Sequence, residues 1–183
     1  MLVRDSDTCC VLDSSLQFLY CNPAWDDFAR SNGGTESVLA HSLMHKRLLT
    51  YIPEIIKPFF VEHFNALRAG GGIWRHRYEC SSPTDFRMFE MQAVRLWDEN
   101  EILICHILKI NRPHDRTPID PPPRRLGQVH ICCHCRRTLR QDDSGIWDWI
   151  PAYLTDPPAD RADDLCPPCA ENYREGFEPR LSP

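Results

Sequence analysis

A chain of 183 residues has room for one ordinary domain, or for a small domain with an appendage. Its 21 Lys and Arg residues against 26 Asp and Glu residues give a net charge of −5, which argues against a protein that coats nucleic acid or an anionic membrane through its overall field. No apolar run approaches the roughly 18 residues of a membrane span, and the start, MLVRDSDTCC, lacks the apolar core of a secretory signal. We therefore expect a cytoplasmic protein that does not contact a membrane.

The N-terminal half predicts a hairpin followed by two helices. The hairpin covers roughly residues 11–20. An Asn-Pro pair at 22–23 begins the first helix, because Asn caps a helix and Pro suits its first turn, and Asn-Gly-Gly at 32–34 ends it. The second helix begins around Pro53 and ends at the three glycines of 70–72.

Three stretches with strand character follow, at 74–80, 86–96 and 102–110. In the first, Trp74 and His76 share one face and charged residues the other. The third is almost entirely apolar. Antiparallel hairpins of this kind form a meander in which one face is buried.

The predicted order of a hairpin, two helices and three strands resembles the PAS domain family. Two segments carry the resemblance: FLYCNPAWDDFARSNGG and RYECSSPTDFRMFEMQAVRL. The resemblance covers roughly residues 8–112. It implies an α+β fold with a five-stranded antiparallel sheet and flanking helices. It also implies a sensory or regulatory role. In this family a small ligand, when one is bound, lies between the sheet and the helices, and its identity in this chain is not indicated by the sequence.

Few residues of this unit suggest a particular cofactor. A haem-binding PAS subfamily uses a His on the longer helix, where His63 lies, but we expect His63 to be a partly buried or surface residue beside an apolar stripe. The Asn-Cys-Arg-Phe-Leu motif of flavin photosensors is absent. We expect His106 to be a core or interface histidine, and Cys80 and Cys105 to be small buried apolar residues.

Composition changes at Pro113. Residues 113–127 hold five prolines and few apolar residues, which is typical of a linker. The remaining residues, 128–183, are too few to be stable through burial alone and predict a cross-link. We therefore divide the chain into a PAS-like sensor domain (8–112), a Pro-rich linker (113–127) and a zinc-binding module (128–183).

Two CxxC motifs in the last segment predict a metal site. Cys132 and Cys135 form one motif, and Cys166 and Cys169 form the other after 30 intervening residues. Each motif directs two thiolates at one ion, and four thiolates suit tetrahedral Zn²⁺. Because such a site has no open position, a structural role is favoured over catalysis. Cys133 lies off the ligand positions, and a redox dithiol or unrelated buried cysteines remain alternatives.

The spacer between the motifs contains IWDWIPAYL, whose apolar residues can form a small core around the metal. The apolar residues concerned are Ile146, Trp147, Trp149, Ile150, Tyr153 and Leu154. The succession CHCRR, WDWIPAY, LCPPC resembles a segment attached to bacterial sensory proteins, including PAS proteins. That segment commonly has the sequence Ser-His-Gly before its second CxxC motif. This chain has Ala-Asp-Asp there, at 162–164, so any role that depends on the family's His is in doubt.

These features indicate a cytoplasmic sensory or regulatory protein that acts through protein–protein interaction. We expect a homodimer or a signalling partner, because the strand face of Leu103, Cys105 and Ile107 is apolar where a solvated face would be polar. The chain lacks GxSxG, P-loop, GxGxxG and HExxH motifs, so we expect no enzyme.

Two other functions stay open. One is a thiol-redox sensor that uses Cys132, Cys133 and Cys135. The other is a transcriptional regulator that binds nucleic acid through the zinc module. The residues that would contact nucleic acid are Arg124, Arg125, Arg136, Arg137 and Arg140 on phosphates, with Trp147 or Trp149 on bases.

Overall fold

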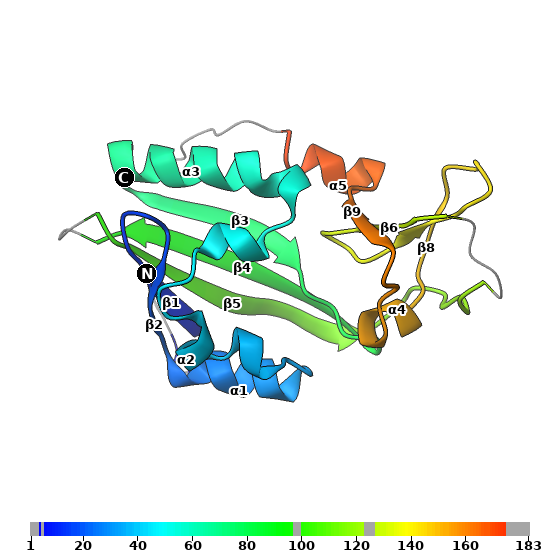
Figure 1. The fold of residues 1–183 in the computed structure, drawn as a ribbon, viewed down its shortest axis with the longest axis horizontal. Coiled ribbons are helices and arrows are strands. Elements are labelled where there is room, and N and C mark those ends of the chain that lie inside the picture. The colour runs from blue at the N-terminus through cyan, green and yellow to red at the C-terminus, as the bar shows by residue number, and fades with distance from the viewer. Residues whose placement is uncertain (1–3, 5, 97–99, 123–126, 175–183) are drawn as a thin grey trace.

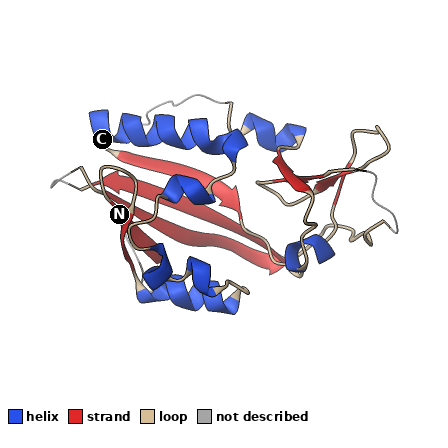
Figure 2. Cartoon of the chain, in the orientation of Figure 1, coloured by secondary structure: helices blue, strands red, loops and turns tan. Residues whose placement is uncertain are grey.

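Two β-sheets, with the helices around them, make up the chain (Figure 1). The computed structural model describes residues 4, 6–96, 100–122 and 127–174. The long strands of the larger sheet and the short strands of the smaller one lie on opposite sides of Figure 2. We call residues 8–112 the PAS-like unit and residues 127–174 the C-terminal unit.

The larger sheet has five strands. They are β1 (Thr8–Leu12), β2 (Phe18–Cys21), β3 (Ile73–Glu79), β4 (Asp85–Arg95) and β5 (Ile102–Pro113). All neighbours pair antiparallel, in the order β2-β1-β5-β4-β3. The most apolar stretch of the sequence is therefore the central strand, and β3 forms an edge. This sheet with its flanking helices confirms the expected PAS-like α+β fold.

The chain between β2 and β3 is helical. Its elements are α1 (Pro23–Ser31), η1 (Glu36–Val38), α2 (Ala40–Leu43), η2 (Leu48–Tyr51), η3 (Glu54–Ile56) and α3 (Lys57–Gly70). Asn22 caps α1 as predicted, because its side chain accepts from the Trp25 N–H at 3.2 Å. Among the described residues, no helix has both the length and the apolarity needed to cross a bilayer.

The predicted start of the second helix at Pro53 was too early. A separate short 3₁₀ turn, η3, occupies the first residues, and α3 begins at Lys57. Pro58 supplies the reason, since it lies in the first turn of α3, where its missing N–H costs no hydrogen bond. The predicted end is correct: Gly71 caps α3 with φ of 70°.

The core of the PAS-like unit lies between the sheet and the helices. Phe64 and Leu67 of α3 pack there against Trp74 of β3 and against strands β1, β4 and β5. The buried members of this cluster are Cys10, Leu12, Leu16, Phe18, Cys21, Leu43, Phe64, Leu67, Trp74, Met91, Ala93, Ile102 and Ile104. Trp74 and His76 are both buried, as the alternation in β3 predicted.

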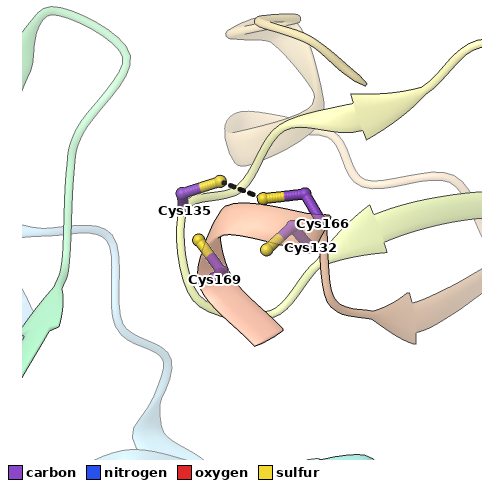
Figure 3. A group of neighbouring side chains, drawn as sticks. All are labelled: Cys132, Cys135, Cys166 and Cys169. Carbon is purple, nitrogen blue, oxygen red and sulfur yellow. Dashed lines mark hydrogen bonds between the residues drawn. The ribbon is translucent and has the colours of Figure 1, made fainter. Parts of the chain in front are cut away.

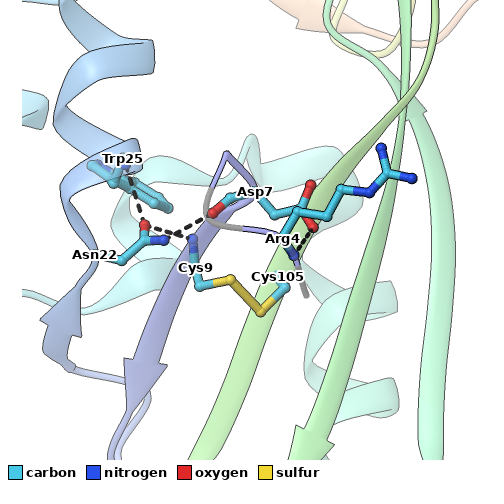
Figure 4. The surroundings of a disulfide bond; sticks show 6 residues. All are labelled: Arg4, Asp7, Cys9, Asn22, Trp25 and Cys105. Atoms are coloured by element: carbon cyan, nitrogen blue, oxygen red, sulfur yellow. Dashed lines mark hydrogen bonds between the residues drawn. A yellow bond between two sulfur atoms is a disulfide. The ribbon is translucent and has the colours of Figure 1, made fainter. Parts of the chain in front are cut away.

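A disulfide on the opposite face of the sheet was missed by sequence reasoning. Cys9 and Cys105 lie directly across from each other on β1 and β5 and are bonded (Figure 4). Cys10 and Ile104 belong to the core, so by strand alternation the bonded pair faces away from it. Cys105 is buried as expected, but its disulfide was not predicted, because cross-strand partners cannot be identified without the register.

The C-terminal unit contains a four-stranded sheet in the order β8-β7-β6-β9. Its elements are β6 (Val129–Cys132), β7 (Thr138–Leu139), β8 (Trp147–Asp148), α4 (Ala152–Thr155), β9 (Arg161–Asp164) and α5 (Pro167–Glu171). Strands β6 and β9 pair in parallel, with Cys132 opposite Asp164. This pairing brings the two CxxC motifs together from distant parts of the sequence.

The described part of the predicted linker packs against its neighbours. Strand β5 continues to Pro113. The His114 ring lies 4.4 Å from the Trp149 ring, centroid to centroid, and the Ile119 N–H donates to the Trp149 carbonyl at 2.8 Å. Residues 123–126 lie outside the described part of the chain. The domain boundaries stay a prediction.

Candidate metal centre

The first CxxC motif lies in the tight turn from β6 to β7. Cys132 ends β6, and the Arg136 N–H donates to its carbonyl at 2.9 Å, while the Cys132 N–H donates to the Arg137 carbonyl at 2.8 Å. Arg136 adopts a left-handed φ of 63°, which lets the chain reverse after Cys135. The turn thereby directs the sulfurs of Cys132 and Cys135 towards one point.

The second motif lies at the start of α5. Cys166 is the residue before the helix, Pro167 is at its first position, and the Cys169 N–H donates to the Cys166 carbonyl at 2.9 Å. The Cys133 N–H donates to the Asp164 carbonyl at 2.8 Å and joins the two motifs. The first turn of α5 therefore places Cys166 and Cys169 opposite Cys132 and Cys135.

The four sulfurs have the arrangement that a tetrahedral ion requires (Figure 3). All lie within 4.8 Å of one another, and the Cys135 and Cys166 sulfurs are 3.7 Å apart. A Zn–S distance of about 2.3 Å corresponds to a tetrahedral S···S edge of roughly 3.8 Å. All four residues are buried, so water does not compete at the centre. These residues fit a structural Zn²⁺, and their role as its ligands stays a prediction.

The electrostatics of the sulfurs also favour a cation. Hydrogen bonds from the Cys135 and Cys169 thiols hold the pKa of Cys132 well below its usual range, assisted by backbone N–H groups of the two motifs. The hydrogen bond to Cys132 in turn raises the pKa of Cys135 to about 12. These hydrogen bonds favour the thiolate form at Cys132, and binding of an ion releases the protons of the remaining thiols.

A compensating positive charge comes from a residue that the sequence did not identify. Arg116 donates to the Cys135 carbonyl at 3.0 Å and to both carboxylate oxygens of Glu79, at 2.8 and 2.6 Å. Arg116 belongs to the predicted linker, and only the folded chain brings it to the turn that holds Cys132 and Cys135. Each of the two CxxC turns is called a knuckle below.

The expected small core around the cluster is present in part. Trp147 and Leu165 pack against the four cysteines. Trp149 and Ile150 are buried, whereas Ile146 is 45% exposed.

Cys133 and His134, the competing ligands, lie off the metal centre. Burial, assisted by the charge of Cys132, raises the pKa of Cys133 to about 12. A protonated thiol is a poor nucleophile, which disfavours Cys133 in a redox role. His134 instead places its Nδ1 3.0 Å from the Tyr173 hydroxyl.

Most described residues expected to contact nucleic acid are engaged elsewhere. Arg140 forms a two-point ion pair with Asp148, with distances of 2.5 and 3.0 Å. Trp149 is buried, with the Arg116 guanidinium 5.1 Å from its ring centroid. Arg136 is exposed. Arg124 and Arg125 lie outside the described residues. A base-stacking role for Trp149 is therefore disfavoured.

His63 and His106 pack among aromatic side chains of the PAS-like unit, and His63 is more deeply buried than the sequence suggested. His63 is buried, with its Nδ1 2.7 Å from the Phe59 carbonyl and its ring stacked on Trp74 at 4.7 Å. The Nδ1 of His106 lies 2.8 Å from the Tyr78 hydroxyl. Burial lowers the pKa of His106 to about 4. The expectation of a satisfied core histidine at 106 is confirmed.

No protein-family profile matches this chain, and no curated protein matches it. Solved structures do resemble it. One is the photoactive yellow protein domain from the sensor histidine kinase Ppr of Rhodospirillum centenum, with 12% identity and a TM-score of 0.42, over 56% of this chain and 91% of that chain. Another is a PAS domain from a two-component sensor histidine kinase, with 21% identity and a TM-score of 0.33, over 60% of this chain and 86% of that chain.

Proposed function

We propose that this protein is a sensory or regulatory protein in which a PAS-like unit is joined to a module built on a structural zinc ion. The convergence of four buried sulfurs within 4.8 Å carries the proposal. A bound Zn²⁺ supplies a cross-link and no open coordination position. The module then serves as a platform for protein contacts rather than as a catalytic centre.

Zinc stoichiometry tests the metal site. The purified chain should hold one zinc ion, and either Cys132→Ser or Cys169→Ser should lose most of it. Cys133→Ser is the matched control, because it removes a neighbouring thiol that lies off the ligand positions. Full zinc occupancy in both ligand variants would overturn the assignment.

The proposed mode of action is association through the sheet face that points away from the core. Leu103 and Ile107 of β5 lie on this face beside Cys105 and are partly exposed. An apolar sheet face of this kind is stabilised when a second surface covers it. We propose that a second copy of the chain does so, with a heteromeric signalling partner as the alternative.

Light scattering tests the association. The chain should be a dimer, and Leu103→Lys should make it monomeric without loss of folding. Ile55→Lys changes an equally apolar side chain on η3, 48% exposed, and should leave the dimer intact. Two results together would contradict the proposal: a monomer at high concentration, and no other protein bound through this face.

A further inference from the structure

Two aromatic side chains beside the CxxC motifs point away from the metal centre: Tyr173, which contacts the PAS-like unit, and His134, which contacts Tyr173. His134 lies between the two cysteines of the first motif. Tyr173 follows Cys169 by four residues, on the turn that continues α5, where its N–H donates to the Ala170 carbonyl at 3.2 Å. Figure 1 shows α5 beyond the N-terminal end of α3.

His134 contacts Tyr173, and Tyr173 contacts the PAS-like unit. The His134 Nδ1 is 3.0 Å from the Tyr173 hydroxyl. The Tyr173 ring lies 5.1 Å from the Phe59 ring of α3 and 5.5 Å from the His76 ring of β3, measured between centroids. Both His134 and His76 are buried at this contact. One side chain beside each metal knuckle thus takes part in this chain of contacts.

A second, ionic contact joins the same two parts. Arg116 bridges the carboxylate of Glu79, at the end of β3, and the carbonyl of Cys135. The Glu79 side chain is only 4% exposed, and the Ser81 hydroxyl also donates to it, at 2.5 Å. Separation of the two units would break the bond from Arg116 to the Cys135 carbonyl and expose this buried ion pair to solvent on that side.

Both contacts end on β3, which is an edge strand. Within the described sheet β3 pairs with β4 alone, so half of its backbone is not held by a neighbouring strand. Local stability varies within a fold, and edge elements open more readily than central ones. Contacts at His76 and Glu79 therefore have a large effect on whether β3, and the start of α3 beside it, stays ordered.

The positions of His134, Tyr173 and the Cys135 carbonyl depend in turn on the two knuckles. A four-thiolate site rarely keeps its geometry without its ion. We propose that metal occupancy of the four-cysteine site controls the docking of the C-terminal unit on the PAS-like unit, and through this docking the order of β3 and the start of α3. This docking contact comprises Phe59, His76, Glu79, Arg116, His134 and Tyr173. The inference rests on the proposed zinc site and adds that the site regulates the PAS-like unit.

Hydrogen–deuterium exchange of the full chain tests the proposal, with zinc bound and after removal of zinc by EDTA. Removal should raise exchange throughout the C-terminal unit. It should also raise exchange in β3 and the start of α3, by roughly tenfold, as expected for the loss of aromatic pairs together with an ion pair. Strands β1 and β5 should be unchanged. If exchange rises only in the C-terminal unit, the docking proposal is wrong and the zinc site stands; if the chain binds no zinc, both fail.

Variants separate docking from metal binding. Tyr173→Ala should retain one zinc per chain and yet show the raised exchange in β3 and α3, whereas Tyr153→Ala, on α4 of the same unit, should behave like the unchanged protein. Should Tyr173→Ala lose zinc, two other variants leave the four cysteines in place. Tyr173→Phe removes only the hydroxyl contact with His134, and Arg116→Gln removes the ion pair with Glu79 and the bond to the Cys135 carbonyl. Unchanged exchange in β3 for both of these variants, with zinc retained, overturns the proposal.

Discussion

The two parts of this chain are stabilised by different means. The PAS-like unit buries a cluster of 13 residues between a five-stranded sheet and its helices. The C-terminal unit has short strands of two to four residues, and its most buried cluster is the four cysteines themselves. A unit with so little apolar core depends on a cross-link, whereas the larger unit depends chiefly on burial, with the Cys9–Cys105 disulfide in addition. The comparison predicts that a different perturbation destabilises each part.

The largest effect should follow zinc removal. Binding of structural zinc contributes on the order of 10 kcal/mol in small metal-dependent domains. EDTA should therefore unfold the C-terminal unit and leave the fold of the PAS-like unit in place, with the local loosening of β3 described above. Region-by-region hydrogen exchange measures this difference. Equal loss of structure in both units would contradict the comparison.

The converse perturbation is a cavity in the apolar core. Phe64 is fully buried on α3, so Phe64→Ala should destabilise the PAS-like unit by about 3–5 kcal/mol and leave zinc content unchanged. Val61, on the same helix, is 36% exposed, and Val61→Ala should cost less than about 1 kcal/mol. Denaturant titration measures the free energy of unfolding of both variants. A similar decrease in the two would show that burial of Phe64 does not stabilise this core.

A pH effect should be specific to the PAS-like unit. Burial lowers the pKa of His106 to about 4 in the folded chain, below the value of about 6.5 for an unfolded histidine. The unfolded chain thus binds more protons between these values, and stability is lost as pH falls from 6.5 towards 4, at up to about 1.4 kcal/mol per pH unit.

His106→Phe should reduce this pH dependence, at the cost of an unpaired Tyr78 hydroxyl. His41→Gln, at a side chain 66% exposed, is the control and should keep the slope. Zinc release at low pH affects all three proteins alike, so the difference in slope isolates His106. An unchanged slope in His106→Phe would show that another group is responsible.

The smallest effect concerns the knuckle backbone. Arg136 has a positive φ, which costs roughly 1 kcal/mol for a residue with a side chain and nothing for glycine. Arg136→Gly should therefore raise the thermal stability of the zinc-loaded C-terminal unit slightly. Arg137→Gly, next along the chain and without a positive φ, should lower it. The opposite ranking would indicate that the Arg136 charge matters more than its backbone.

Sequence patterns predicted local features well and long-range partners poorly. The cap at Asn22, the end of the second helix at the glycines, and the alternation of Trp74 and His76 all depend on neighbours in the chain. The convergence of Cys132 and Cys135 with Cys166 and Cys169 could be anticipated because the ligand spacing is itself a local signal.

The missed features depend on register and docking. The pairing of Cys9 with Cys105 follows from the alignment of β1 with β5, across 96 residues of sequence. Arg116 was assigned to a linker by composition, although it is the cation between Glu79 and Cys135. The contact of Tyr173 with Phe59 of α3 likewise follows from how the units pack, which no short pattern encodes.

Native mass spectrometry of the full chain, purified from its own host, tests the central claim most directly, since it detects metal, disulfides and oligomeric state together. We expect the mass of each chain to include one zinc ion, with the four ligand cysteines otherwise unmodified, and Cys132→Ser to lose that ion. A metal-free chain in which these four cysteines form disulfides would contradict the claim and would favour the redox alternative.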